Sequence, residues 1–255
     1  MQDAGGKTKE VVPYSAYDPF AWYYRRGWGD EFHVNARPVL DRHVFPRLPE
    51  HARILDLCCG SGDLTAFLIH RGYTVTGVDG SAEMLRYASE QAPAATLLHC
   101  DARSLDLPPE FDACLSTFDS MNHMLEIDEL EHVFRNVYHA LKPGGLFVFD
   151  LNMEKAFEDQ WRGTWAAVED DSVGLTRGAY DSYRRLGRAD VTVFRKELGG
   201  MWSRADTSVY ERCYTEDEAA GALRRAGFIH VQARDAGELG MKELAEGRMF
   251  FFATK

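Results

Sequence analysis

The residues with the clearest chemical meaning lie in one short stretch, Ile54 to Asp63. Here an apolar run contains an acid, Asp56, and then breaks into a turn of small residues. The segment after the turn carries Leu64, Phe67 and Leu68 at helical spacing, which predicts a helix. A strand, a tight turn and a helix in this order let a ligand contact bare backbone beside the positive end of a helix.

A second acid, Asp79, ends the next apolar strand, Tyr73 to Val78. In doubly wound folds an acid at this position accepts hydrogen bonds from a ribose. We therefore expect an adenosine-containing cofactor at the carboxyl edge of a parallel sheet. Nicotinamide and flavin enzymes carry G-x-G-x-x-G after the first strand. That pattern fails here, because its third glycine would fall on Thr65 and a shifted frame puts Cys58 first.

The same stretch resembles motif I of class I S-adenosylmethionine (SAM)-dependent methyltransferases, written D-x-G-x-G-x-G. Asp56, Gly60 and Gly62 match the motif, and Cys58 stands where it has its first glycine. A cysteine there requires a backbone conformation compatible with a Cβ, and it slightly reduces the room near the cofactor.

Three further stretches resemble the same family, in the right order. Val78 to Leu85 resembles the D-x-S-x-x-M-L motif, Leu97 to Ala102 the third-strand motif, and Leu141 to Phe149 the L-K-P-G-G turn before the fifth strand. The resemblance covers residues 50–150 well and is nearly silent on residues 155–210. It implies SAM as cofactor and S-adenosylhomocysteine as product. The cofactor-binding residues expected are Tyr14, Tyr24, Arg37, Asp56, Cys58, Gly60, Gly62, Asp79, Gly80, Ser81, Met84, Asp101, Ala102, Phe118 and Asp119.

The loop after the fourth strand, Thr117 to Met124, is polar directly after an apolar strand. This is where ligands meet the carboxyl edge of such a sheet. His123 is the best-placed histidine in the chain, and it is the candidate base for a proton from an amine or hydroxyl. The alternative is that His123 only orients the loop. The residues expected to contact substrate are Tyr17, Asn122, Asn152 and Tyr180.

Residues 13–48 are rich in aromatic side chains. Tyr17, Phe20, Ala21 and Tyr24 fall on one helical face, and a second helix is expected from Phe32 to Val44. Most of these residues would pack on the sheet. The functional hypothesis is a lid, because aromatic faces attract a cation such as a sulfonium.

Strand and helix signals alternate over residues 50–150, which predicts a parallel sheet with right-handed crossovers. Strands are expected at 53–57, 74–78, 96–99, 112–117 and 145–150, and helices at 62–71, 81–91 and 129–141. A capping box, Thr215 to Glu218, opens a later helix that Gly227 ends. Phe228 to Ala233 and Met249 to Ala253 supply the last two strands, which the resemblance makes an antiparallel pair.

Residues 155–214 change character, with alternating runs such as Asp190 to Arg195 between glycine-containing turns. This pattern predicts an antiparallel β insertion of three or four strands, which would serve as a substrate cap or as a homodimer surface. The expected fold is therefore α/β, a Rossmann-like doubly wound, mostly parallel seven-stranded sheet with a β insertion and an N-terminal helical lid. Its parts are a disordered tail (1–12), the lid (13–48), the SAM-binding domain (49–154 and 215–255) and the insertion (155–214).

The 255 residues have 45% hydrophobic content and a net charge of −11, which suits one α/β domain with a modest addition. Nucleic-acid partners are not expected, because they require a basic face. Five cysteines without a secretory signal indicate reduced thiols and a cytoplasmic location, and the cysteines and histidines lack metal-ligand spacing. No apolar run reaches membrane-spanning length.

The leading hypothesis is a SAM-dependent methyltransferase that moves a methyl group to an amine or hydroxyl of a small molecule by in-line displacement. The alternatives are a nicotinamide-dependent oxidoreductase and a SAM-binding protein without turnover.

Overall fold

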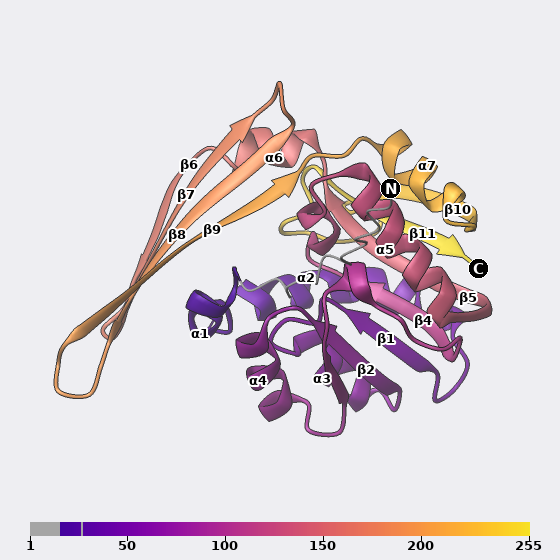
Figure 1. Ribbon diagram of the computed structural model, residues 1–255, viewed down its shortest axis with the longest axis horizontal. Helices are drawn as coiled ribbons and strands as arrows, with labels where there is room; N and C mark the ends of the chain where they lie inside the picture. The colour runs from indigo at the N-terminus through magenta and orange to yellow at the C-terminus, as the bar shows by residue number, and fades with distance from the viewer. Residues whose placement is uncertain (1–15, 27) are drawn as a thin grey trace, which may run out of the picture.

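The computed structural model describes residues 16–26 and 28–255, so the predicted tail and Tyr14 lie outside the described residues. A seven-stranded sheet forms its centre, in the order β10-β11-β5-β4-β1-β2-β3 (Figure 1). Its strands are β1 (Arg53–Leu57), β2 (Thr74–Asp79), β3 (Thr96–His99), β4 (Phe111–Ser116), β5 (Leu141–Asn152), β10 (Ile229–Asp235) and β11 (Arg248–Thr254).

Strands β3, β2, β1, β4 and β5 pair in parallel, whereas β11 runs antiparallel to both β5 and β10. This arrangement confirms the predicted Rossmann-like sheet with its antiparallel edge pair. The helices are α1 (Ala21–Tyr24), α2 (Trp28–His43), α3 (Asp63–His70), α4 (Ala82–Gln91), α5 (Ile127–Ala140), α6 (Glu154–Gln160) and α7 (Glu216–Arg225).

Both faces of the central sheet are covered, so its middle strands are apolar on both sides. On β1, Leu55 and Leu57 belong to one buried cluster, which includes residues of α5 and α7. Ile54 belongs to a second cluster, which includes residues of α2 and α3. The apolar residues that predicted this strand, interrupted only by Asp56, therefore reflect burial on two faces.

The turn before the fifth strand differs from the prediction. Helix α5 ends at Ala140, and Leu141 already pairs with Phe111 of β4. The register then shifts, so that Ala113 pairs with Leu146. Residues 142–145 thus form an irregular start of β5 in place of a separate turn.

The N-terminal segment is also less regular than predicted. A short 3-10 turn (Asp18–Phe20) precedes the four-residue helix α1, and α2 begins at Trp28, before the predicted start at Phe32. Tyr17, Phe20 and Tyr24 still form one cluster, with ring centroids 5.0 to 6.5 Å apart.

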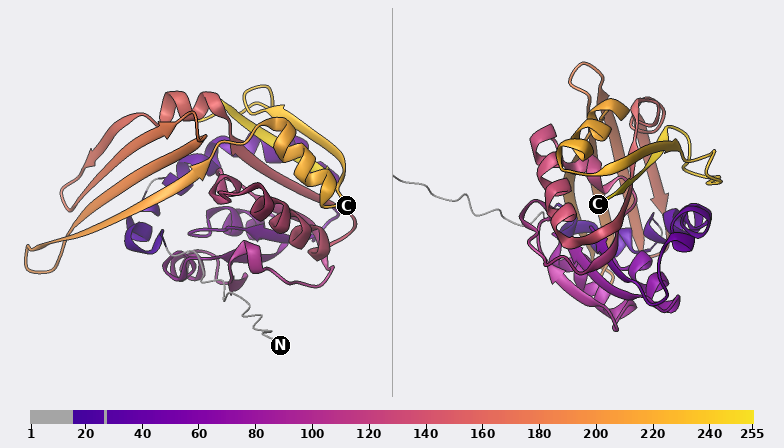
Figure 2. Two further views of the ribbon diagram at one scale, coloured as in Figure 1. Left: turned by 45° about the horizontal axis from the view of Figure 1, so that its top comes forward. Right: turned by 90° about the vertical axis from the view of Figure 1, so that its right-hand side faces the viewer.

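Helix α6 opens the region after β5 and was not predicted. A four-stranded antiparallel meander follows: β6 (Gly163–Val168), β7 (Ser172–Asp181), β8 (Leu186–Lys196) and β9 (Trp202–Arg212). Figures 1 and 2 show this second sheet extending from one side of the central sheet, with α1 beneath it.

Phe20 packs in a third buried cluster with Val191, Val193 and Val209. The first described residues therefore lie against the insertion.

All five cysteines are free thiols. Within residues 16–26 and 28–255, no helix is long and apolar enough to cross a bilayer, and no cluster of His, Cys, Asp and Glu has the geometry of a metal site.

Candidate active site

A cavity of about 400 Å³ opens where three parts of the chain meet. These parts are the N-terminal segment, the loops at the carboxyl edge of the central sheet, and the inner face of the insertion. The predicted site residues that line it are Tyr17, Tyr24, Cys58, Gly60, Asp79, Gly80, Met84, Asp101, Ala102, Phe118, Asp119 and His123. The cavity volume falls within the usual range of ligand pockets.

The glycine-containing turn after β1 forms the floor of this cavity. Gly62 has φ 88°, and a Cβ there would lie 2.9 Å from Cα of Ala88, so only glycine lets α3 and α4 approach this closely. Cys58 has φ 60°. This value lies in the left-handed region, where a residue with a Cβ loses roughly 1–2 kcal/mol. The backbone at Cys58 therefore adopts a conformation that suits a glycine, and the expectation of a conformation that favours a Cβ was wrong.

Two acids at strand ends are fixed by their neighbours. Asp79 accepts hydrogen bonds from the backbone N–H groups of Gly60 and Ser81, both at 2.8 Å. Asp101 accepts hydrogen bonds from the backbone (2.8 Å) and the guanidinium (2.6 Å) of Arg103. Arg103 lines the cavity and was not predicted, because no motif marks the residue two positions after this acid.

The loop after β4 is strained at the point where it enters the cavity. Phe118 and Asp119 have φ values of 65° and 51°, and consecutive non-glycine residues in this region are uncommon. Asp150 of β5 holds them there by accepting both backbone N–H groups, at 2.7 and 3.0 Å. Strain of this kind persists only where the surroundings fix it, and it is concentrated at functional sites.

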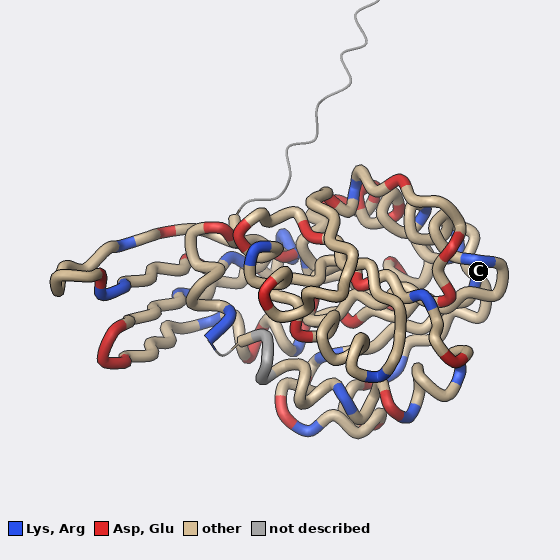
Figure 3. The backbone as a smooth tube through the Cα atoms, turned by 90° about the horizontal axis from the view of Figure 1, so that it is seen from below, with Lys and Arg blue, Asp and Glu red and all other residues tan. Residues whose placement is uncertain are grey.

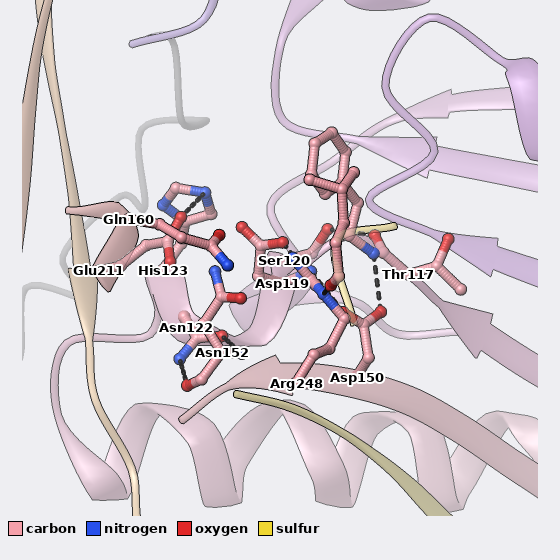
Figure 4. A network of polar contacts seen from close by, with 12 residues as sticks. Thr117, Asp119, Ser120, Asn122, His123, Asp150, Asn152, Gln160, Glu211 and Arg248 are labelled. Carbon is pink, nitrogen blue, oxygen red and sulfur yellow. Dashed lines mark hydrogen bonds and ion pairs between the residues drawn. The ribbon is translucent and has the colours of Figure 1, made fainter. Parts of the chain in front are cut away.

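Arg248 of β11 completes this group by donating to the carboxylates of Asp119 and Asp150 (Figure 4). Its guanidinium also lies over the rings of Phe32 and Phe118, with centroids 4.9 and 5.8 Å away. Burial by itself lowers the pKa of Arg248, but the two carboxylates outweigh burial and raise it. The sequence offered no signal for Arg248, since its partners lie on distant strands.

His123 is held by the insertion and by the N-terminal segment. Its Nδ1 lies 2.9 Å from the backbone oxygen of Tyr210, and because a carbonyl only accepts, we assign the proton to Nδ1. Nε2 is then the acceptor, and the hydroxyl of Tyr17 donates to it at 3.0 Å. Burial lowers the pKa of His123, although the charge of Asp119 partly opposes this. The neutral imidazole is therefore favoured.

Glu211 of β9 lies beside this histidine, with Oε1 3.7 Å from Nε2. Its side chain is buried, and Oε2 has no hydrogen-bond partner among the described residues. Burial and the nearby Asp119 raise the pKa of Glu211 well above its ordinary value. In Figure 4, Glu211, His123 and Gln160 lie on one side of the network, and Arg248 and Asp150 lie on the other.

Four predicted cofactor residues lie outside the lining of the main cavity. Asp56 accepts a hydrogen bond from Thr65 and borders a second, smaller cavity, and burial raises its pKa to about 7. Ser81 caps α4 and donates to Asp18. Arg37 lies with its guanidinium 4.9 Å from the centroid of Phe67. Gly62 also lies outside the lining, against α4.

Asn122, predicted to bind substrate, instead holds the loop in place through the backbone of Asn152, the other asparagine predicted to bind substrate. Asn122 is fully buried, and its amide donates to the backbone oxygens of Asn152 (3.0 Å) and Arg212 (2.8 Å). It also accepts from the backbone N–H of Asn152. This pair ties the loop to β5 and β9, so neither side chain borders the cavity.

Tyr180 stacks on Phe157, with centroids 5.2 Å apart, and lies outside the lining. The aromatic wall of the insertion comes instead from Trp161 and Trp165, which were not predicted. Strand alternation was visible in the sequence, but it does not tell which face covers the cavity.

Comparison with known proteins identifies the chain. A family model described as a methyltransferase domain matches residues 54–145. A putative methyltransferase of Geobacillus is 30% identical over 210 residues, which cover 80% of this chain and 84% of the relative. The chain belongs to the SAM-dependent methyltransferases. Its cofactor is SAM, so the nicotinamide alternative is excluded.

The chain is also similar to a solved methyltransferase structure and to a methyltransferase that acts on an amino sugar. A crystal structure of a SAM-dependent methyltransferase from Clostridium acetobutylicum superposes with a TM-score of 0.77 at 22% identity, covering 94% and 99% of the two chains. That likeness concerns the fold. The dTDP-3-amino-3,4,6-trideoxy-alpha-D-glucopyranose N,N-dimethyltransferase of Streptomyces venezuelae is 29% identical over 136 residues, 53% of this chain and 57% of the relative.

Proposed function

We propose that this methyltransferase transfers a methyl group to an amine or hydroxyl of a small molecule, by in-line displacement, with His123 as the base. The observation that carries the proposal is that the two strand-end acids and His123 line one cavity. Asp79 and Asp101 lie at the strand ends where an adenosine binds. His123, the proposed base, lines the same cavity.

The described residues fit SAM. Asp79 would accept from the ribose hydroxyls, and Met84, which is buried and lines the cavity, would pack on the adenine. Asp101 has one carboxylate acceptor site left after its three bonds to Arg103, and this site would take the adenine amino group. Tyr24 and Phe118 would flank the sulfonium, because aromatic faces attract a cation. Arg37, outside the cavity, receives no role.

SAM supplies a methyl group on a sulfonium, whose departure needs no acid. The chain must therefore align the acceptor, exclude water and remove one proton. Because Nε2 of His123 accepts from the hydroxyl of Tyr17, the proton would reach Nε2 through this hydroxyl, which gives its own proton to Nε2 as it takes one from the acceptor.

The N-terminal segment supports the proposed lid by bridging both sides of the cavity. Asp18 accepts from Ser81 and from the backbone N–H of Glu83. Thr207 of the insertion donates to the backbone oxygen of Ala16 at 2.8 Å. Opening this segment would expose the cofactor edge.

The insertion is proposed as the substrate cap, because residues of its inner face line the cavity. A homodimer through the same insertion stays a prediction.

Small-molecule acceptors fit the charge distribution. Figure 3 shows Lys and Arg interspersed with Asp and Glu along the chain, and several arginines of the insertion form ion pairs with carboxylates. Arg185 binds Glu218 and Arg188 binds Asp190, at 2.6 and 2.7 Å. This pairing supports the prediction that nucleic acid is not a partner. The relative that dimethylates an amino sugar supports nitrogen as the acceptor atom.

Calorimetric titration of the purified protein with S-adenosylhomocysteine, beside NADH, tests cofactor binding. Binding of the first alone is expected, and binding of NADH alone would overturn the proposal. Methyl transfer to a panel of amines is then measured for wild type, His123→Ala and His132→Ala. His132 is exposed on α5 and serves as the control.

His123→Ala should still bind S-adenosylhomocysteine but lose turnover by roughly 100-fold or more, while His132→Ala behaves as wild type. Unchanged turnover in His123→Ala would contradict the base assignment. A SAM-binding protein without turnover would show no methyl transfer to any member of the panel.

A further inference from the structure

Carboxyl groups outnumber cations on the lining of the cavity. Among the described lining residues Arg103 is the one with a permanent positive charge, and it is already engaged. It pairs with Asp101 at 2.6 Å and with Glu129 at 3.0 Å.

The carboxyls on the lining are those of Asp79, Asp101, Asp119 and Glu211. Asp119 shares the single charge of Arg248 with Asp150, and the raised pKa of Glu211 favours its neutral form. The cofactor side of the cavity must hold the carboxylate of SAM, but the described residues that the insertion contributes to the lining include no Lys or Arg. A carboxylate or phosphate of the acceptor against this face would therefore have no cation to pair it, which is costly.

Arg188 of β8 cannot pair with an anionic group in the cavity, because it lies on the outer face of the insertion. On β8, Ala189 and Val191 line the cavity, so Arg188 and Asp190 between and beside them lie on the opposite face. The same alternation puts Val209 and Glu211 of β9 inward. Among the lining residues that the insertion contributes, Glu211 is the one ionisable side chain, and its raised pKa favours the neutral form.

Two tryptophans supply a flat aromatic wall. Trp165 of β6 pairs with Thr176 of β7, and both line the cavity beside Trp161. A Cβ at Gly178 would lie 2.9 Å from the backbone of Trp161 and 3.0 Å from the ring of Trp165. The absent side chain at Gly178 thus lets both tryptophans lie against the sheet and leaves an apolar surface for a ring or chain.

From these observations we infer that the acceptor is an amine on an apolar, ring-bearing skeleton, without a carboxylate or phosphate. The aromatic wall would hold the skeleton. The carboxyl of Asp119 and the surrounding aromatic faces would attract the ammonium form, and His123 would take its proton. This inference rests on the proposed function and narrows its acceptor class.

Calorimetry on protein saturated with S-adenosylhomocysteine tests the inference with two matched pairs of probes. Phenethylamine and phenylalanine share a ring and an amine, and they differ by a carboxylate. Cyclohexylamine and glucosamine are both ring amines, and they differ in the hydroxyls of the ring. We expect the first member of each pair to bind at least tenfold more tightly than the second.

Equal or tighter binding of phenylalanine or glucosamine would overturn the inference, and so would binding of none of the four. The proposed methyltransferase function would still stand in these cases, because S-adenosylhomocysteine binding and methyl transfer to other acceptors are measured separately. Loss of S-adenosylhomocysteine binding would instead mark failure of the function itself.

Two tryptophans of nearly equal exposure test whether the aromatic wall binds the amine. Trp165 is 45% exposed and lines the cavity, whereas Trp202 is 46% exposed and lies outside the lining. Trp165→Ala should weaken phenethylamine binding by about tenfold, with Trp165→Phe intermediate and Trp202→Ala unchanged. Equal losses in the two alanine variants would overturn the role of the aromatic wall.

Discussion

The hydroxyl of Tyr17 lies 3.0 Å from Nε2 of His123, and it joins the first described turn of the chain to the loop after β4. The two rings meet edge to face, with centroids 5.6 Å apart. Because the backbone oxygen of Tyr210 fixes the tautomer of His123, the proposed lid contacts the same nitrogen that would accept the substrate proton. Closing the N-terminal segment and orienting the base are therefore one structural event.

Tyr17→Phe tests this link. Loss of the hydroxyl that passes the proton to the base should lower kcat at least about tenfold, while S-adenosylhomocysteine affinity stays within a few-fold of wild type. Tyr183→Phe is the control, because Tyr183 is 97% exposed and lies outside the cavity lining. Steady-state kinetics with an amine that the wild-type enzyme methylates measure this effect. An unchanged kcat would mean that the hydroxyl does not act on His123.

The pH dependence of the rate should report His123. Burial lowers its pKa below the ordinary 6.5, so the neutral base persists to more acidic pH than a free histidine. We expect kcat/KM to rise with pH along a limb whose apparent pKa lies below 6.5, and this limb should be absent from the residual activity of His123→Ala. An apparent pKa above 6.5 would contradict the structural assignment.

The same shift affects stability. In the window between the lowered folded-state pKa and 6.5, the unfolded chain binds more protons at this position than the folded chain does. Stability should therefore fall as the pH decreases through this window. Thermal denaturation of wild type and His123→Gln across pH 5 to 7.5 measures the effect, and a variant that loses as much stability in acid as wild type would contradict it.

We expect Arg248 to stabilise the fold as well as the site. Arg248→Met leaves the carboxyls of Asp119 and Asp150 buried without their cation, and removing one partner of a buried pair costs about 3–5 kcal/mol. Arg204→Met is the matched control, because Arg204 and Asp206 form an exposed pair whose loss should leave the free energy of unfolding nearly unchanged. Urea denaturation compares the two variants, and similar losses would refute the importance of the buried network.

The parts of the molecule that could be predicted from the sequence are those governed by local rules. Asp79 and Asp101 directly follow apolar runs, and strand ends in a parallel sheet meet at one edge. The strand over Arg53–Leu57 was predicted correctly because its burial on both faces makes every residue between Arg53 and Leu57 apolar except Asp56. In contrast, α6 is only seven residues long, which is too short for a clear helical period.

The residues that were missed depend on contacts between distant segments. Arg248 reaches Asp119 and Asp150 only after β11 has paired with β5. The inward position of Glu211 follows from the alternation of β9, but the sequence does not show that this face of β9 lies over the cavity. Asn122 was placed in the correct loop, yet its three backbone hydrogen bonds require the final packing of β5 and β9.

The free-energy cost of ionising the buried Asp56, the acid of the first motif, can be measured from the pH dependence of stability. Burial raises its pKa from 3.8 to about 7, against the opposing hydrogen bond from Thr65. Because the folded chain keeps this proton where the unfolded chain releases it, the stability due to this group is complete below pH 4 and is lost as the pH rises through 7. Asp56→Asn keeps an acceptor for Thr65 and cannot ionise.

Asp56→Asn should therefore match wild type at pH 4.5 and exceed it at pH 8, by on the order of a few kcal/mol. Asp112→Asn on the neighbouring strand β4 should instead be less stable than wild type by a constant amount over this pH range. Hydrogen bonds from Lys142 and from the backbone N–H of Arg53 outweigh partial burial and lower the pKa of Asp112, so its ionised form stabilises the fold above pH 4. Denaturant midpoints of both variants from pH 4.5 to 8 should diverge with rising pH, and parallel curves would show that the Asp56 carboxyl is solvated in the folded protein.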